Sequence, residues 1–246
     1  TLVNASASEN AATVTQNGDN NDSTVGQNGI SLTATVLQDG DDSDSTVTQS
    51  GDGSSASVTQ SGLNQSATTT QAGFDNNSGI SQTGVNNTAN VSQDGTGNNS
   101  TVTQSGDNGF VVGTSLVFVD QIGVDNGSTV NQVGDGPNTV DVSQNGISNR
   151  STVLQLINDG FGNAATVDQT GNGNASTVTM GNVLFSDRNT VSVTQEGNTN
   201  TSFVTVNGFD NDATVEQLAD DNLSTIIQQG TGNIADVSQS SNGNSS

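Results

Sequence analysis

Residues 93–104 read QDGTGNNSTVTQ, and this stretch contains the pattern that decides the fold. Every second residue from Asn98 to Gln104 belongs to the pattern, which reads Asn-x-Ser-x-Val-x-Gln. A period of two is the period of a β-strand, in which alternate side chains share one face. Gly95 lies two residues after the preceding Gln93, and glycine tolerates the positive φ that a tight corner requires. The stretch therefore predicts an arm that consists of a short strand followed by a corner.

The same arm of 11 residues is found twenty times along the chain, with a few longer intervals. Two arms have Met180 and Val206 in the last slot, and the other arms end in Gln. The glutamines in this slot are Gln16, Gln27, Gln38, Gln49, Gln60, Gln71, Gln82, Gln93, Gln104, Gln121, Gln132, Gln144, Gln155, Gln169, Gln195, Gln217, Gln228 and Gln239.

Three further slots are nearly as regular. Val stands two residues before the Gln slot in most arms, Ala or Ser stands four before it, and Gly stands two after it. Asn stands six before it in most arms, at Asn10, Asn21, Asn76, Asn87, Asn98, Asn126, Asn138, Asn149, Asn163, Asn174, Asn189, Asn200, Asn211, Asn222 and Asn233. Because these slots alternate, we expect Asn, the small residue, Val and Gln to share one face of each strand.

If successive arms lay side by side in one flat sheet, their Val side chains would stay exposed. If each coil contains two arms, the Val faces of the two strands can meet and bury each other. We therefore predict an all-β fold, a flattened two-sided β-solenoid of about ten coils with two strand-turn arms in each coil. At a strand spacing of about 4.8 Å the stack is roughly 48 Å long. We expect such stacks to join end to end into a cross-β fibre.

The longer intervals between arms support two arms per coil. The intervals that end at Gln121, Gln144, Gln169 and Gln195 are longer than the others, and each joins an odd-numbered arm to an even-numbered one. The small slot also differs between odd and even arms over much of the chain, as in Ser100 and Val117. All the inserted loops are therefore expected along one edge of the solenoid.

The pattern divides the chain into three parts. Residues 1–9 form an N-terminal segment that we interpret as a junction strand, because Val3 falls in a Val slot. Residues 10–241 form the β-solenoid repeats, with insertions near 107–117, 156–163 and 181–190. Residues 242–246 form a C-terminal tail, in which Asn244 and Ser246 fall in the Asn and small slots of a further partial arm.

The inward face is unusually polar, so burial of Val alone does not offset the entropy lost on ordering the chain. We expect the remainder from backbone ladders and from Asn and Gln amides that are hydrogen-bonded along the stack. A buried amide without such a neighbour would be left unsatisfied. The two terminal coils would expose unpaired strand edges, which template the addition of another chain.

Composition excludes most other functions. The chain has 246 residues, a formal net charge of -23, and no His, Cys, Trp or Tyr. Without His, Cys or Lys it lacks the usual nucleophiles and bases, so we expect no enzyme and no catalytic, cofactor or metal site. The charge disfavours nucleic acid, and no apolar run is long enough to span a membrane. Residue 1 is Thr, which we interpret as the start of an exported chain whose signal peptide has been removed.

The repeat resembles the curlin repeat, the unit of curli-type bacterial amyloid fibres. The similarity is seen from Gln93 through Asn98, Ser100 and Val102 to Gln104, and it covers about residues 10–241. The resemblance implies a major fibre subunit that crosses the outer membrane unfolded through a secretion pore. It also implies nucleated head-to-tail polymerisation on the cell surface, with a nucleator as partner, and a role in biofilm matrix and adhesion.

Two other functions stay open on the residues. The chain could be a nucleator or minor fibre subunit, or a monomeric β-solenoid adhesin that binds ice or carbohydrate. Outward Thr pairs such as Thr13 and Thr15 suit an ice-binding face, but similar pairs fall on both odd and even arms. The acidic stretch from Asp39 to Asp44 lacks the spacing of a calcium loop, so we expect at most weak Ca²⁺ binding by the surface.

The insertion edge is rich in apolar residues, which suggests a lateral contact between fibres or with a partner. Packing of the loops on one another is the alternative. The candidate contact residues are Phe110, Val111, Val112, Leu156, Ile157, Phe161, Val183, Leu184, Phe185 and Phe209.

Overall fold

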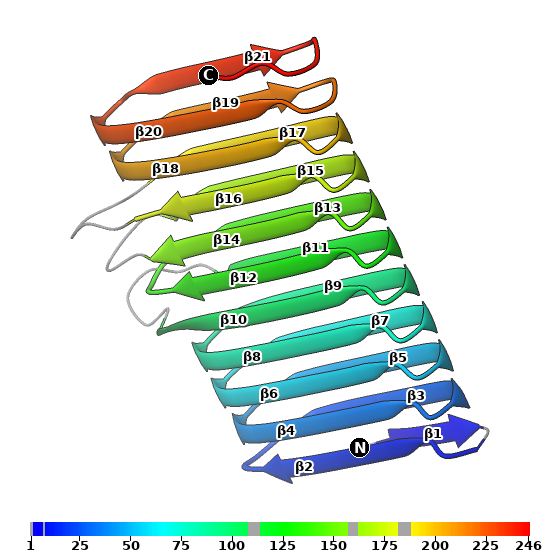
Figure 1. The fold of residues 1–246 in the computed structure, drawn as a ribbon. Helices are drawn as coiled ribbons and strands as arrows, with labels where there is room; N and C mark the ends of the chain where they lie inside the picture. Colours follow the sequence, from blue (N-terminus) through cyan, green and yellow to red (C-terminus); the bar gives the residue numbers. More distant parts are fainter. Residues whose placement is uncertain (1, 7, 108–113, 157–161, 182–187) are drawn as a thin grey trace.

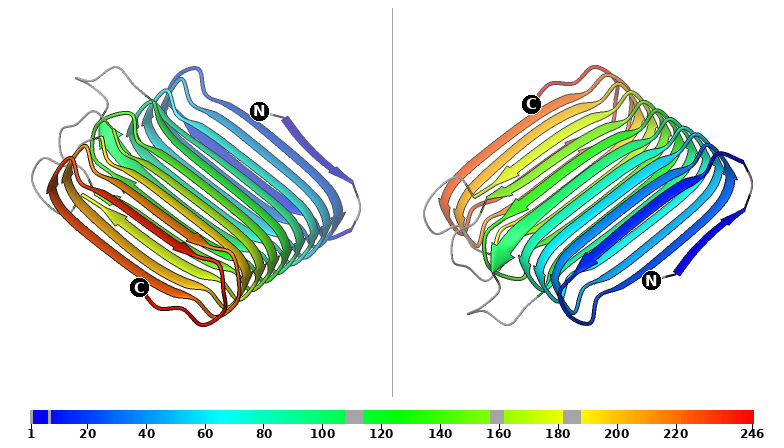
Figure 2. Two further views of the ribbon diagram at one scale, coloured as in Figure 1. Left: turned by 90° about the horizontal axis from the view of Figure 1, so that it is seen from above. Right: turned by 90° about the horizontal axis from the view of Figure 1, so that it is seen from below.

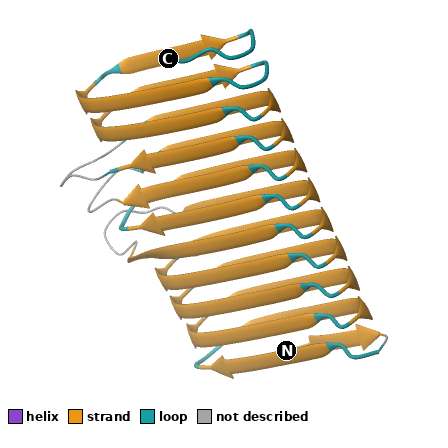
Figure 3. Ribbon diagram, viewed as in Figure 1, coloured by secondary structure: helices purple, strands orange, loops and turns teal. Residues whose placement is uncertain are grey.

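The computed structural model describes residues 2–6, 8–107, 114–156, 162–181 and 188–246. These residues form strands and corners without any helix (Figure 1 and Figure 3). The strands of the first half are β1 (Leu2–Ser6), β2 (Ala11–Asn17), β3 (Asp22–Ile30), β4 (Thr33–Asp41), β5 (Asp44–Asp52), β6 (Ser55–Leu63), β7 (Ser66–Phe74), β8 (Asn77–Val85), β9 (Asn87–Thr96) and β10 (Asn99–Asp107). Those of the second half are β11 (Ser115–Val124), β12 (Gly127–Val133), β13 (Thr139–Ile147), β14 (Arg150–Leu156), β15 (Ala164–Asn172), β16 (Ala175–Met180), β17 (Thr190–Asn198), β18 (Thr201–Phe209), β19 (Asp212–Gln217), β20 (Leu223–Thr231) and β21 (Ile234–Gln239).

Successive strands alternate between two parallel sheets. The odd-numbered strands form an 11-stranded sheet from β1 to β21, and the even-numbered strands form a 10-stranded sheet from β2 to β20. Figure 2 shows the two sheets as flat layers that face each other. The chain is therefore an all-β, two-sided β-solenoid of about ten coils, as the sequence predicts.

The register places equivalent residues of successive coils side by side. Val102 of β10 pairs with Ile80 of β8 and with Val130 of β12. The Gln slot behaves in the same way, because Gln104 pairs with Gln82 and Gln132. A shift by one residue would turn every inward side chain to the solvent, so the alternating pattern itself specifies this register.

The core is narrow, and large side chains of one sheet lie opposite small ones of the other. The Val-slot side chains of the central coils are 0–2% exposed, including the polar Thr69 that takes the slot in β7. Thr69 Oγ1 lies 3.3 Å from Ser78 Oγ in the small slot of β8. The Val slot thus faces the small slot across the core, which explains why Ala or Ser stands there in most arms.

Glycine is required at the corners because the backbones of successive coils come close together. Gly73 has a φ of +99°, and a Cβ added to it would lie 2.1 Å from the carbonyl oxygen of Gly95. The same contact recurs from Gly95 to Gly123. The column of glycines therefore sets both the sharpness of the corner and the spacing of the coils.

The four lengthened connections all leave the 10-stranded sheet and enter the 11-stranded sheet, so the described strand ends that they join belong to one edge of the solenoid (Figure 1). Most of the apolar candidates on this edge lie outside the described residues, and only Leu156 and Phe209 are described. Their role in lateral contact stays a prediction. Within the described residues no helix is long and apolar enough to cross a membrane.

Both chain termini take slots of the repeat. Val3 in β1 pairs with Val25 of β3, in the same column as the buried valines. At the other end the backbone N–H of Asn244 donates to Oδ1 of Asn222, and Ser245 forms a bridge with Leu223 of β20. Residues 244–246 thus begin a further strand beside β20.

Substitution of Gly73 by Ala is expected to destabilise the solenoid by about 1–3 kcal/mol, because the added methyl group meets the next coil at a left-handed backbone position. Chemical denaturation of the soluble chain measures the effect. Gly79→Ala is the matched control, since no atom lies within 4 Å of its Cβ position. An equal loss of stability in both variants would contradict this account of the corner.

Candidate functional site

The glutamines form two hydrogen-bonded ladders along the stack, one in each sheet. Each Gln Nε2 donates to the Oε1 of the Gln one coil further toward the C-terminus, at 2.7–3.0 Å. In the 11-stranded sheet the ladder is unbroken and joins Gln27, Gln49, Gln71, Gln93, Gln121, Gln144, Gln169, Gln195, Gln217 and Gln239. In the 10-stranded sheet it joins Gln16, Gln38, Gln60, Gln82, Gln104, Gln132 and Gln155.

Each carboxamide also ties one sheet to the other. Gln82 is fully buried, and its Nε2 donates to Gln104 Oε1 at 2.9 Å and to the carbonyl oxygen of Ser66 at 2.9 Å. Its Oε1 accepts from Gln60 at 3.0 Å. Ser66 belongs to the opposite sheet, so one side chain bonds along the stack and across the core. A polar group buried in this way is satisfied only when its neighbours carry the same residue.

The ladder of the 10-stranded sheet is interrupted on two neighbouring strands. Met180 in β16 and Val206 in β18 occupy the Gln slot, and both are fully buried in the core. Beyond the interruption Gln228 Oε1 is buried without a hydrogen-bond partner in the described structure. The interruption therefore replaces a polar contact by an apolar one and leaves one acceptor unsatisfied.

The asparagines fix each corner to the next coil. Asn98 Nδ2 donates to the carbonyl oxygens of Asp94, in its own corner, and of Gly123, in the next coil. Asn98 Oδ1 accepts from the backbone N–H of Asn126 at 3.1 Å. The same pattern runs through Asn126, Asn149 and Asn174.

One residue with this role does not follow the Asn pattern in the sequence. Gln65 occupies the Asn slot of its arm, and its Nε2 donates to the carbonyl oxygens of Ser61 and Gly84. Its distance of six residues from Gln71 was the available signal.

The small slot behaves differently from the Asn slot. The small-slot hydroxyls of Ser100, Ser128 and Ser151 have no hydrogen-bond partner in the described structure. Small volume, rather than hydrogen bonding, is thus the requirement at that slot.

The ladders have a direction, and their two ends differ. At the N-terminal end Gln27 Oε1 is buried and has no partner among the described residues, because Ala5 takes the Gln slot in β1. At the C-terminal end Gln239 Nε2 donates to the carbonyl oxygen of Leu223, and the described chain provides no Gln beyond it. The two ends therefore differ: the ladder stops beneath the edge strand β1 at the N-terminal end, and it reaches the edge strand β21 at the C-terminal end.

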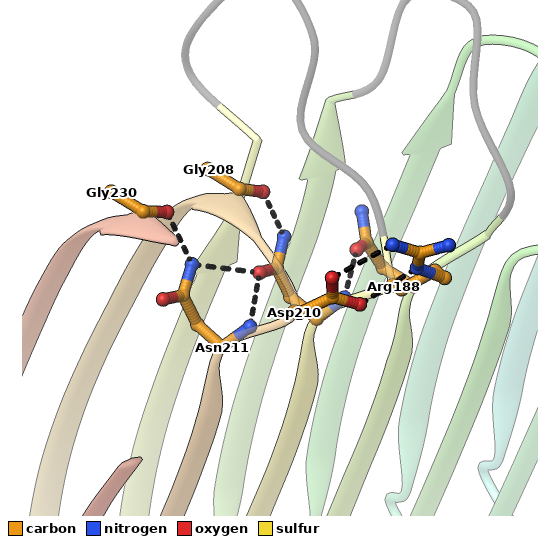
Figure 4. A network of polar contacts seen from close by, with 7 residues as sticks. Arg188, Gly208, Asp210, Asn211 and Gly230 are labelled. Atoms are coloured by element: carbon orange, nitrogen blue, oxygen red, sulfur yellow. Dashed lines mark hydrogen bonds and ion pairs between the residues drawn. The ribbon is translucent and has the colours of Figure 1, made fainter. Parts of the chain in front are cut away.

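Arg188 and Asp210 form a surface ion pair on the insertion edge (Figure 4). The guanidinium donates to both carboxylate oxygens at 2.7 Å, which lowers the pKa of Asp210. Beneath them Asn211 donates to Asn189 Oδ1 and to the carbonyl oxygen of Gly230. Because the two charged side chains are about half exposed, we expect the pair to contribute little to stability.

The outer faces of the two sheets carry different charge. Outward side chains stand five, three and one residues before each Gln slot and one residue after it. At these positions the described 10-stranded sheet carries one carboxylate, Asp39, and one cation, Arg150. The 11-stranded sheet carries Asp22, Asp44, Asp94, Asp120, Asp141, Asp168, Glu196, Asp212, Glu216 and Asp236.

Three of these acidic residues lie close together near the middle of the face. Burial raises the pKa of Asp141, and the negative charges of Asp168 and Asp120 raise it further. Within the described residues no group of three or more Asp or Glu side chains is arranged to hold a metal ion. Weak surface binding of Ca²⁺ therefore stays a prediction.

Comparison with protein families agrees with the geometry of the stack. The family model of the curlin associated repeat matches the chain three times, at residues 24–51, 84–111 and 187–218. The chain thus contains curlin associated repeats. No curated protein matches it. Curlin repeats are found in extracellular curli fibres, and repeat and solenoid together indicate a structural, non-enzymatic protein.

Gln82→Ala is expected to destabilise the solenoid by about 2–4 kcal/mol, because it opens a cavity and leaves the amides of Gln60 and Gln104 each without one partner. Denaturation of the soluble chain in urea measures the loss. Ser81→Ala on the same strand, with an outward side chain, should change stability by less than about 0.5 kcal/mol. A variant at Gln82 that is as stable as the one at Ser81 would show that the ladder contributes nothing.

Asp141→Asn is expected to stabilise the protein at pH 7. A carboxyl group with a raised pKa disfavours the folded state when it is charged, and this penalty disappears as the pH falls through the raised pKa toward 3.8, the ordinary value. The gain in thermal midpoint should therefore be present at pH 7 and absent at about pH 3. Asp22→Asn, on the same face but far from the cluster, serves as the control. A gain that grows on acidification would contradict the assignment.

Proposed function

We propose that the chain is a secreted structural subunit that polymerises end to end into extracellular amyloid-like fibres. The observation that carries this proposal is the regular parallel register of the stack, which leaves β1 and β21 as the two edge strands of the same sheet. A second subunit placed at the C-terminal end in the same orientation would set its β1 beside β21 and extend both sheets. Ala5 of that β1 would stand next to Gln239, so the joint depends on the backbone and on the Val column rather than on the Gln ladder.

The edge strands supply the backbone part of the contact. β1 and β21 are the edges of the 11-stranded sheet, and β2 and β20 those of the 10-stranded sheet. An edge strand with a regular alternating pattern is a template for another chain. Addition of β1 of the incoming subunit to β21 would continue the column of Val237 and Val215 with Val3.

The partial strands at the termini fit the same joint. Residues 244–246 lie beside β20 in the 10-stranded sheet, whereas β1 lies in the 11-stranded sheet. When two subunits meet head to tail, these two segments occupy the two sides of one shared coil. The joint would then repeat the geometry of the interior, which supports polymerisation without a separate adaptor.

Two alternatives make different predictions. A nucleator or minor subunit would seed growth of another chain more strongly than it grows itself, and a monomeric adhesin would not grow at all. Fibre growth of the purified chain, followed by electron microscopy and by the effect of preformed seeds on the lag time, separates them. Secretion, biofilm matrix and adhesion follow from the family and are part of the proposal.

Asp236→Pro is expected to block growth while the solenoid itself stays folded. The carbonyl oxygens of Asn233 and Gln239 accept from the N–H groups of Asp212 and Leu218, so by alternation the N–H of Asp236 points away from β19, toward the incoming strand. Proline there removes one donor of the joint but none within the molecule. Seeded growth should fall about tenfold or more, for a loss of at least about 1.4 kcal/mol at the joint. Asp236→Ala should grow normally, and growth of the proline variant at the normal rate would refute the joint.

A further inference from the structure

The outer face of the 10-stranded sheet is nearly free of charge in a strongly acidic protein. Its outward positions carry Asp39 and Arg150, which cancel, whereas those of the 11-stranded sheet carry ten carboxylates and no described cation. The whole chain has a net charge of -23. The negative charge is thus kept off one broad, flat surface, which we call the neutral face.

We propose that the neutral face is a docking surface for a second copy of this chain, which binds through its own neutral face. Contact between two acidic faces would set carboxylates against carboxylates, and contact between unlike faces would bury many of them without partners. Contact between two neutral faces avoids both costs. It also leaves both acidic faces in water, where their mutual repulsion is screened.

The neutral face is large enough for such a contact. Ten strands at about 4.8 Å, each presenting about 20 Å of its length, give roughly 1,000 Å² for each copy. A stable protein interface buries about 800 Å² on each partner. The face also carries apolar side chains that project from it, because Phe203 is 47% exposed and Ile227 is 68% exposed.

The shape of the neutral face suggests how two copies fit together. Gly79 and Gly127 leave depressions in it, since no side chain of their own fills them. We place a twofold axis in the interface, parallel to the strands and midway between β12 and β14. This axis reverses the order of the strands in the second copy but leaves each residue at the same distance along its strand. It sets β8 against β18 and β12 against β14, so Phe203 of one copy enters the depression at Gly79 of the other.

The same axis places Arg150 of one copy over Gly127 of the other. Gly127 lines a groove of about 540 Å³ on the neutral face, and Asp125 and Arg150 line it too. Arg150 makes no ion pair within the described structure, so its guanidinium is available to the Asp125 carboxylate of the second copy. The lone cation of the face thereby gains a partner in the dimer.

The absence of Cys in the chain allows a direct test by disulfide cross-linking. The double variant Gly79→Cys and Phe203→Cys should form a covalent dimer under mild oxidation. Within one molecule the two positions are five strands apart, about 24 Å, and subunits joined end to end hold them no closer. A disulfide requires about 4.4–6.8 Å between Cα atoms, so the bond reports face-to-face pairing alone.

The matched control is Thr68→Cys with Ser192→Cys, which lie at equivalent positions five strands apart on the acidic face. Both pairs are also tested in the Asp236→Pro background, where end-to-end growth is blocked. Cross-linking there supports the proposal independently of fibre growth. Equal yields from the two faces, or no dimer from Gly79→Cys with Phe203→Cys in either background, would overturn it.

A charge placed on the neutral face gives the second measurement. Thr152→Asp, added to the cysteine pair on this face, should slow cross-linking about tenfold, and Thr68→Asp on the acidic face should leave it unchanged. Circular dichroism confirms that each variant is folded. A neutral polysaccharide is the alternative occupant of the face. The proposal would be overturned if the cysteine pair does not cross-link and the chain instead binds insoluble cellulose in a way that Thr152→Asp abolishes.

Discussion

The hydrogen bond between identical buried glutamines of successive coils is the interaction on which the rest of the structure depends. A carboxamide in a narrow core is stable only if each of its groups finds a partner, and the partner here is the same residue one coil away. This condition imposes a parallel, in-register stack. It also explains why repetition is retained through the lengthened connections, since a coil out of register would leave several amides unsatisfied.

The same condition gives the stack a direction. Ladder donors point toward the C-terminus throughout, so the two ends of the stack are not equivalent. The interruption at Met180 and Val206 shows that one ladder tolerates an apolar pair where the other is intact. The two sheets thus differ in the number of Gln–Gln hydrogen bonds that they contain, and their outer faces differ in charge.

Much of the fold was predictable because the determining contacts are between equivalent positions. Period two in the arm specifies the inward face, and the lengthened intervals before Gln121, Gln144, Gln169 and Gln195 specify one edge. The role of Gln65 was missed because it departs from the Asn pattern, and its amide reaches the same carbonyl oxygens as Asn does. The loop residues from Phe110 to Val112 lie outside the described residues, so their role stays a prediction.

The amino-acid sequence by itself determined that the chain is a β-solenoid with Asn, Val and Gln inside, because side-chain alternation and a constant repeat length allow few other arrangements. Only the tertiary structure decided which atoms pair, in which direction the ladders run, and that the small slot of one sheet lies opposite the Val slot of the other. Those features depend on how two sheets lie relative to each other, and no spacing along the chain encodes that distance directly.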